Sequence, residues 1–174
     1  MTTSHSQSGS QGSFELVLAE REQIGIIANL FELYAHDFSE FYPVELGADG
    51  RFGNPKLPLY WSEPDRYPFL IKVEGKLSGF ALVKRQPGLA TNGDVWDVGD
   101  FFIVRGSRRH GIGTEVTQKL WQSFPGPWEV RVMDSNRAAF GFWPRAVEKF
   151  ARKAIPPVRI EKDGVVWHTF AFES

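Results

Sequence analysis

Cysteine is missing from all 174 positions of the sequence. Its absence excludes disulfide scaffolds, thiol nucleophiles and cysteine-ligated zinc, and it fits a reducing cytoplasm, the compartment that we expect. Histidine is also sparse, with four widely spaced copies: His5, His36, His110 and His168. No two of them have the i, i+4 spacing of a helical metal pair, so we expect no metal cofactor.

The sequence also lacks an excess of positive or negative charge. The 20 basic and 21 acidic residues give a formal net charge of -1. A near-neutral chain is not a general polyanion binder, so we expect neither nucleic acid nor a membrane as a partner. A basic cluster at residues 105–110 keeps a small nucleic-acid-binding module open as an alternative. No apolar run reaches the roughly 20 residues of a membrane span.

The length is that of one domain. We expect a flexible tail over residues 1–13, which are polar and lack the apolar segment of a secretory signal. Residues 14–174 are expected to form a single domain. Aromatic residues make up 14% of the chain, which predicts an aromatic core or pocket. Assembly as a homodimer stays open.

The apolar spacing predicts alternating strands and helices. Alternation predicts strands at 14–18, 69–73, 77–83, 95–104, 128–133, 158–161 and 165–172. Helical spacing predicts helices at 24–41, around 116–124 and at 139–150. Residues 43–66 are rich in glycine and proline, which predicts a long irregular loop. The resulting order, β-α-β-β-β-α-β-α-β-β, indicates a single α/β or α+β domain.

Details within these segments lead to further expectations. Gly99 inside a strand marks a bulge or a close backbone approach. Ser135 or Asn136 can cap the last helix, and Pro144 should kink or restart it. The first helix has no Ser, Thr, Asp or Asn cap at its start.

The segment after residue 104 has the composition of an anion-binding loop. It carries three arginines and His110 before Gly111 and Gly113, and a helical pattern follows. Amides at a helix N-terminus and the helix dipole favour a phosphate, and glycine lets the backbone approach it closely. The alternative is a tight turn with a solvated basic face.

A family resemblance gives this loop a more definite meaning. Arg108-x-x-Gly111-x-Gly113 resembles the R/Q-x-x-G-x-G/A signature of the GNAT superfamily of N-acetyltransferases. A later segment, Asn136-x-x-Ala139-x-x-Phe142-Trp143, resembles that superfamily's N-x-x-A-x-x-F/L-Y element. The two segments lie in the family order, with the strand at 128–133 between them. The resemblance covers roughly residues 14–172 and implies a mixed, mostly antiparallel central sheet flanked by helices.

The resemblance implies an acetyl-CoA-dependent N-acetyltransferase that acts directly on a primary amine. It implies that the pyrophosphate is held by the signature loop, here Arg108, Arg109, His110, Gly111, Ile112, Gly113 and Thr114. The pantetheine would lie along the fourth strand, here Phe102, Ile103 and Val104, where a strand amide would stabilise the oxyanion. The far wall would be formed by Asn136, Phe142 and Trp143. A non-catalytic acyl-CoA-binding or regulatory domain on the same fold is the alternative.

Direct transfer needs a base for the amine. Asp100 is the first candidate because relatives carry an acidic residue on this strand. Asp97 is the second, and strand alternation would point it to the opposite face. Water is the third candidate, in which case Asp100 is a structural acceptor.

The chain departs from the family pattern at the general acid, the residue that protonates the leaving thiolate. Many relatives carry tyrosine where this chain has Trp143, and an indole N–H has no useful acidity. Another donor or solvent must then protonate the thiolate, and the unplaced candidates are Tyr42, Tyr60 and Tyr67. Trp143 can also be a plain core residue.

Residues 22–50 contain six acidic residues and no lysine or arginine. The six are Glu22, Glu32, Asp37, Glu40, Glu45 and Asp49. Aromatic residues flank them, so the segment can form a groove for a small cationic amine, which is the acceptor that we expect. A solvated acidic helix face explains the composition equally well.

Overall fold

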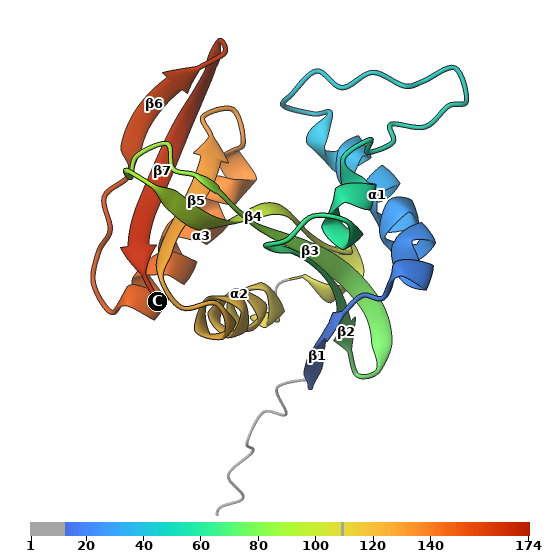
Figure 1. The fold of residues 1–174 in the computed structure, drawn as a ribbon, viewed down its shortest axis with the longest axis horizontal. Coiled ribbons are helices and arrows are strands. Elements are labelled where there is room, and N and C mark those ends of the chain that lie inside the picture. The colour runs from blue at the N-terminus through green and yellow to red at the C-terminus, as the bar shows by residue number, and fades with distance from the viewer. Residues whose placement is uncertain (1–12, 109) are drawn as a thin grey trace, which may run out of the picture.

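The computed structural model describes residues 13–108 and 110–174. Seven strands form one sheet in the order β1-β2-β3-β4-β5-β7-β6 (Figure 1). The strands are β1 (Phe14–Leu18), β2 (Arg66–Val73), β3 (Lys76–Pro87), β4 (Asp94–Ile103), β5 (Pro127–Met133), β6 (Val158–Lys162) and β7 (Val165–Glu173). All neighbouring strands are antiparallel except β4 and β5, which are parallel.

Three α-helices and three short 3-10 helices connect the strands. The α-helices are α1 (Ile24–Phe38), α2 (Ile112–Ser123) and α3 (Arg137–Ala151). The 3-10 helices are η1 (Arg21–Gln23), η2 (Leu57–Trp61) and η3 (Arg105–Ser107). The element order confirms the predicted one, and so does the mixed, mostly antiparallel sheet.

Each face of the sheet has its own apolar core. On one face, α1 and η2 pack on apolar residues of β2, β3 and β4, including Leu70, Phe80 and Phe102. On the other face, α2 and α3 pack over β2 to β5 and β7, around the fully buried Trp121 and Trp128. Alternation along each strand decides which residues enter which core. We call these two sides the α1 face and the α2/α3 face.

Helix boundaries follow local capping. Glu20 and Gln23 form a capping box at η1, directly before α1, so the start of the first helix uses residues outside the usual Ser, Thr, Asp and Asn set. α1 ends at Phe38, before the predicted position 41. In α3, the Asn136 side chain accepts a hydrogen bond from the Ala139 amide, as predicted. The predicted restart at Pro144 is wrong, because α3 runs through it as one helix.

The predicted loop at 43–66 is partly wrong. η2 occupies Leu57–Trp61, with a proline in its first turn, and it buries Leu57 and Tyr60 against the sheet. β2 begins at Arg66, before the predicted position 69. Residues 43–56 contain no helix or strand, so the predicted irregular loop is present there and the prediction is wrong only from residue 57 onward.

Within residues 13–108 and 110–174, no helix is both long and apolar enough to cross a membrane. In the same residues, no group of three or more His, Asp or Glu side chains is arranged to hold a metal ion.

The approach of β3 to β4 gives a test of the fold. Gly79 lies opposite Ile103, and a Cβ there would overlap the Phe102 carbonyl oxygen and lie 3.0 Å from Ile103 Cα. Gly79→Ala should lower the free energy of unfolding by about 1–3 kcal/mol, because two backbones must separate. The exposed Gly25, where a Cβ meets nothing within 4 Å, is the matched control. In chemical denaturation, Gly25→Ala should be neutral or slightly stabilising; equal losses at both positions would contradict this account.

Candidate functional site

β4 and β5 pair over a very short distance. Their parallel register consists of Trp96 with Trp128 and Asp97 with Glu129. Beyond Asp97, β4 continues to Ile103 with β3 on one side and no strand of the described chain on the other. β5 continues beside β7 instead. The two strands therefore open a gap, and the β4 edge there is free to bind a ligand's amide groups.

A bulge sits at the start of this gap. Val83 pairs with Val98, but the next residue of β3, Leu82, pairs with Asp100, so Gly99 is the extra residue. The bulge shifts the alternation by one position, and Asp97 and Asp100 lie on the same face of β4. The prediction that they point to opposite faces is wrong for this reason. Gly99 fulfils the other sequence-based expectation, that it marks a bulge.

The side chains over the bulge come from three elements. A Cβ on Gly99 would lie 3.2 Å from Lys84 Cε on β3 and 3.4 Å from Tyr60 Oη on η2. From α1, Tyr34 reaches Asp100 and packs edge-on against Phe80 and Phe102. Tyr34 belongs to the series of apolar positions that α1 turns toward the sheet. This helical spacing is the sequence signal that could have predicted that Tyr34 lies near β4.

Burial sets the protonation of this cluster. It raises the pKa of Asp100, although Lys84 and a hydrogen bond from Tyr34 oppose the shift. It also raises the pKa of Asp97 to about 6, against the positive charges of Arg131 and Lys84. Both carboxyl groups are thus poised to exchange protons closer to neutrality than a free aspartate. Burial and the charge of Asp100 raise the pKa values of Tyr34 and Tyr60, so both hydroxyls stay protonated.

The other predicted tyrosines lie elsewhere. Tyr67 is on the α2/α3 face, where its ring packs against Trp96 and Phe124. Tyr42 follows α1 and lines a surface cleft described below. Tyr60 alone of the three meets the bulge.

The N-terminus of α2 has the conformation of an anion site. Gly111 is its N-cap, with φ of 80°, a conformation that favours glycine. In the described part of the chain, no side chain caps this helix, and a Cβ on Gly111 would meet nothing within 4 Å. The first amides of α2 therefore have no side-chain cap among the described residues. His110 beside them is exposed, and the predicted contact residue Arg109 lies outside the described residues.

The second glycine of the signature has a packing role. A Cβ on Gly113 would lie 3.1 Å from the Phe142 ring of α3, so Gly113 lets α2 and α3 approach. Ile112 is buried in the same core, while the Thr114 amide donates to the Gly111 carbonyl. Of the loop residues predicted to contact a phosphate, Gly111 has the geometry for it most directly.

The arginines of the loop are tied to α1. Arg108 Nη2 lies 2.8 Å from Asp37 Oδ2, its Nε donates to the Ile103 carbonyl at 2.6 Å, and Arg105 Nη2 lies 2.6 Å from Asp37 Oδ1. Despite the opposing effect of burial, the two arginines lower the pKa of Asp37. Arg108 therefore positions the loop, and main-chain amides are left to meet an anion.

The three predicted pantetheine residues have different surroundings. Phe102 is buried on the α1 face and Ile103 on the α2/α3 face. Val104 follows the end of β4, and its amide donates to the Ser78 carbonyl at 2.8 Å. The Val104 N–H is thus already used, and an oxyanion would need another donor.

The predicted far wall is aromatic. Phe142 stacks on Phe101 with ring centroids 6.0 Å apart, and Trp143 meets Phe101 edge-on at 5.4 Å. Trp143 also packs against Trp121, as expected of a core residue. Asn136 uses its side-chain oxygen to cap α3.

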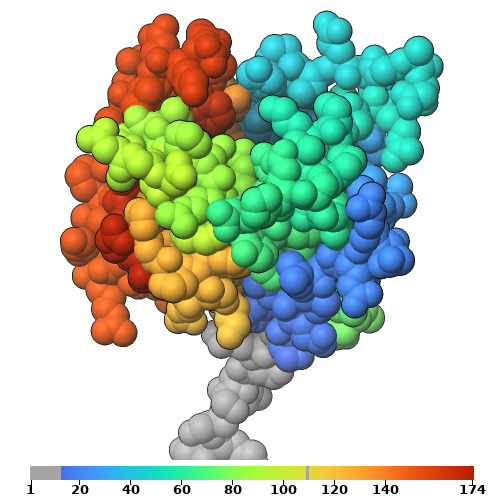
Figure 2. All heavy atoms as spheres, in the orientation of Figure 1, coloured from blue at the N-terminus to red at the C-terminus, as the bar shows by residue number. Residues whose placement is uncertain are grey.

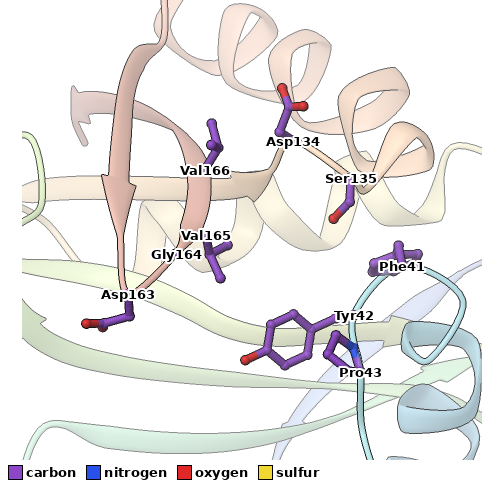
Figure 3. Close-up of a pocket in the computed structure, with 9 residues that line it drawn as sticks. All are labelled: Phe41, Tyr42, Pro43, Asp134, Ser135, Asp163, Gly164, Val165 and Val166. Carbon is purple, nitrogen blue, oxygen red and sulfur yellow. The ribbon is translucent and has the colours of Figure 1, made fainter.

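A cleft of about 510 Å³ lies between the segment after α1 and the β6–β7 turn. Figure 3 shows Tyr42 and Pro43 on one side and Asp163 to Val166 on the other, with Asp134 and Ser135 above. In Figure 2 the same two segments face each other at the top of the molecule. Asp134 is held by His168, whose Nε2 lies 2.8 Å from Asp134 Oδ1.

Two of the six acids predicted to attract a cation have structural partners. Asp37 binds the two arginines, and Glu32 accepts hydrogen bonds from the amides of Phe52 and Gly53. The Glu32 contacts hold the loop after α1, and the Asp37 contacts hold the loop after β4. The composition of residues 22–50 therefore overstates the free negative charge.

Comparison with known proteins supports one interpretation of this geometry. Residues 27–147 match a family described as Acetyltransferase (GNAT) family. No curated protein matches the chain. Solved structures with the same fold include an acetyltransferase from Thermus thermophilus, with 13% identity, a TM-score of 0.67 and coverage of 93% of this chain and 97% of the other. Aminoglycoside acetyltransferase AAC(6')-Ib in complex with coenzyme A has 13% identity, a TM-score of 0.64 and coverage of 92% and 95%. Spermidine N-acetyltransferase from Vibrio cholerae, in complex with CoA and spermine, has 12% identity, a TM-score of 0.57 and coverage of 92% and 95%.

Proposed function

Because the chain belongs to the acetyltransferase (GNAT) family, we propose that it transfers an acetyl group from acetyl-CoA directly to a primary amine. The observation that carries the proposal is the gap between β4 and β5, which opens beside two buried carboxyl groups and leads to an uncapped helix N-terminus. One molecule with an amide-bearing arm and a pyrophosphate fits both features. Acetyl-CoA supplies the activated thioester for this reaction.

Different elements around the gap bind different parts of acetyl-CoA. The free edge of β4 offers hydrogen-bonding groups to the pantetheine arm, and the first amides of α2 meet the pyrophosphate. The stacked pair of Phe101 and Phe142 supports the gap from the α2/α3 face. Arg108 fixes the loop to α1 and β4 rather than meeting the phosphate by its guanidinium.

Asp100 is the group that takes the proton of the attacking amine, directly or through water. It lies at the bulge, its raised pKa makes it a better base, and Tyr34 of α1 reaches it from the α1 face. The positive charge of Lys84 favours the ionised form of this carboxylate. Tyr34 and Tyr60 retain their protons and lie on this same side. Of the three tyrosines predicted from the sequence, Tyr60 is the one placed to replace the acid that Trp143 cannot supply.

The acceptor would enter through the cleft between Tyr42 and the β6–β7 turn. Its aromatic wall and the carboxylates of Asp134 and Asp163 suit a small amine with a positive charge. Relatives of the same fold are complexes with such molecules, kanamycin in one and spermine in another.

The first test concerns the pyrophosphate loop. Gly111→Val forces a β-branched residue to φ of 80°, which re-aims the first amides of α2. We expect the affinity for acetyl-CoA, measured by calorimetry, to fall by at least tenfold, about 1.4 kcal/mol. Gly106→Ala is the control from the same loop, since a Cβ there meets nothing and the backbone lies outside the left-handed region. Unchanged affinity in Gly111→Val would contradict the loop assignment.

The second test concerns the base. Asp100→Asn should lower kcat by about 10²–10⁴-fold while the affinity for acetyl-CoA changes little. The wild-type rate should rise with pH as Asp100 ionises. The variant should lack this rising part of the pH–rate profile, so the ratio of wild-type to variant rates should be largest at neutral pH and above. Single-turnover rates measured over pH 5–8.5 give this profile. A variant whose rate rises with pH in the same way would show that another group is the base.

The third test concerns the acceptor. Thiol release from acetyl-CoA should be stimulated by small amines with more than one positive charge, and less by neutral or anionic amines. Asp163→Asn should raise the KM of a cationic amine and leave that of a neutral amine unchanged. A preference for anionic acceptors would contradict the cationic class, while acetyl-CoA binding without turnover on any amine would favour a non-catalytic CoA-binding domain.

A further inference from the structure

Glu129 is a carboxylate with no exposure at all. It stands on β5, and three consecutive amides of the β3–β4 turn donate to it: Leu89 at 2.8 Å, Ala90 at 2.9 Å and Thr91 at 2.8 Å. Such a run of amides forms a concave anion site made of backbone. These bonds and Arg131 lower the pKa of Glu129 although burial opposes this, so the group is ionised.

Arg131 connects this carboxylate to a second one. Its Nε and Nη2 lie 3.1 Å and 2.8 Å from Glu129 Oε2, and Nη2 also donates to the Pro87 carbonyl at 3.0 Å. On its other side, Nη1 lies 4.0 Å from Asp97 Oδ2. The same Asp97 oxygen accepts a hydrogen bond of 2.6 Å from Gln86 Nε2. Asp97, Arg131 and Glu129 form a buried triad in which one cation separates two anions.

The triad lies at the point where the gap opens. Asp97 and Glu129 are themselves the last parallel pair of β4 and β5. The β3–β4 turn reaches over β5 at this level (Figure 1). Two buried carboxylates side by side repel each other, so this pair keeps its register only with Arg131 between them. Among the described residues, no ion pair joins β4 to β5 after this point.

We propose that the Asp97–Arg131–Glu129 triad is a positioning device, which fixes the apex of the β4–β5 gap and thereby the strand edge that carries Asp100. The proposal rests on the proposed acetyl transfer for its consequence in catalysis. Asp97 and Asp100 are separated only by Val98 and the bulge at Gly99. A shift of Asp97 is therefore transmitted directly to the base and to the edge that follows it. None of the three triad residues needs to touch a substrate for this role.

Several charged or titratable groups face Asp97 and decide how its pKa responds to a change in the triad. They are Lys84 from β3, Asp100 from β4, Glu129 and Arg131 from β5, Tyr34 from α1 and Tyr60 from η2. Of these, Arg131 lowers the pKa of Asp97, and Glu129 raises it. Loss of one partner must therefore move the titration of Asp97 in the direction opposite to loss of the other.

The experiment compares Glu129→Gln, Arg131→Gln and Arg131→Lys with the wild type. Glutamine cannot replace Glu129, because its NH₂ group would face a donor on either side. We expect kcat/KM to fall roughly a hundredfold in Glu129→Gln and Arg131→Gln, the loss that follows a small misplacement of reacting groups. Arg131→Lys keeps the charge and should recover a large part of the activity. Glu148→Gln, at an exposed position on α3, is the control and should match the wild type.

The pH dependence separates positioning from a general structural role. In a carboxyl NMR titration, the inflection of Asp97 should move to higher pH in Arg131→Gln, move to lower pH in Glu129→Gln, and be missing from Asp97→Asn. Equal losses of activity with an unmoved inflection would overturn the proposal, and so would full activity in folded Glu129→Gln. If Glu129→Gln does not fold, the contrast between Arg131→Lys and Arg131→Gln decides.

The same variants distinguish a failure of this inference from a failure of the proposed function. If the wild type neither binds nor consumes acetyl-CoA, the acetyl-transfer proposal fails. The triad is then judged in the ligand-free protein, by carboxyl NMR titration of Asp97 and by hydrogen exchange of the amides of residues 89–91 and 101–103. Faster exchange at both segments in Glu129→Gln supports a positioning role, and faster exchange at 89–91 alone overturns it.

Discussion

β4 and β5 run in parallel, but only Trp96 and Asp97 pair with β5. β4 is antiparallel to β3 over its whole length, and β5 is antiparallel to β7, so each strand is secured on its outer side. The inner edges are therefore free to part without loss of the sheet. The gap, the exposed strand edge and the access to the bulge all result from this short contact.

The carboxyl groups on β4 and on the elements beside it differ in their partners. Asp37 joins the loop after β4 to α1 through two arginines. Glu129 joins the β3–β4 turn to β5. Asp100 differs, because burial acts on it while Lys84 and Tyr34 compensate only in part. This raised pKa beside an open strand edge is the basis of the role that we propose for Asp100 as a proton acceptor.

The sequence was sufficient for the order of elements, because alternation and helical spacing are strong in β4, β5 and α3. The predicted start of a helix directly after the glycine-containing loop is also confirmed, with Gly111 as its N-cap. It did not place Asp97 correctly, because one extra residue at Gly99 reverses the alternation, and the register of β3 against β4 decides where that residue falls. The arginines that bind Asp37 and the turn amides that bind Glu129 are separated from these carboxylates by 38 or more positions, and no local sequence pattern predicts such contacts. Tyr34 carried a helical signal, but its contact with Asp100 depends on how α1 lies across the sheet.

The amide site of the β3–β4 turn has a consequence for synthesis of the chain. Residues 89–91 leave the ribosome before Glu129 does, since the chain grows from its N-terminus. Until β5 has been made, these three amides have no carboxylate to bind and must remain hydrated. The first four strands can pair beforehand, but the turn between β3 and β4 acquires its final shape only when β5 docks. The edge of β4 beside the gap therefore takes its final form only after β5 has been synthesised. An N-terminal fragment released before that point would lack this form of the edge.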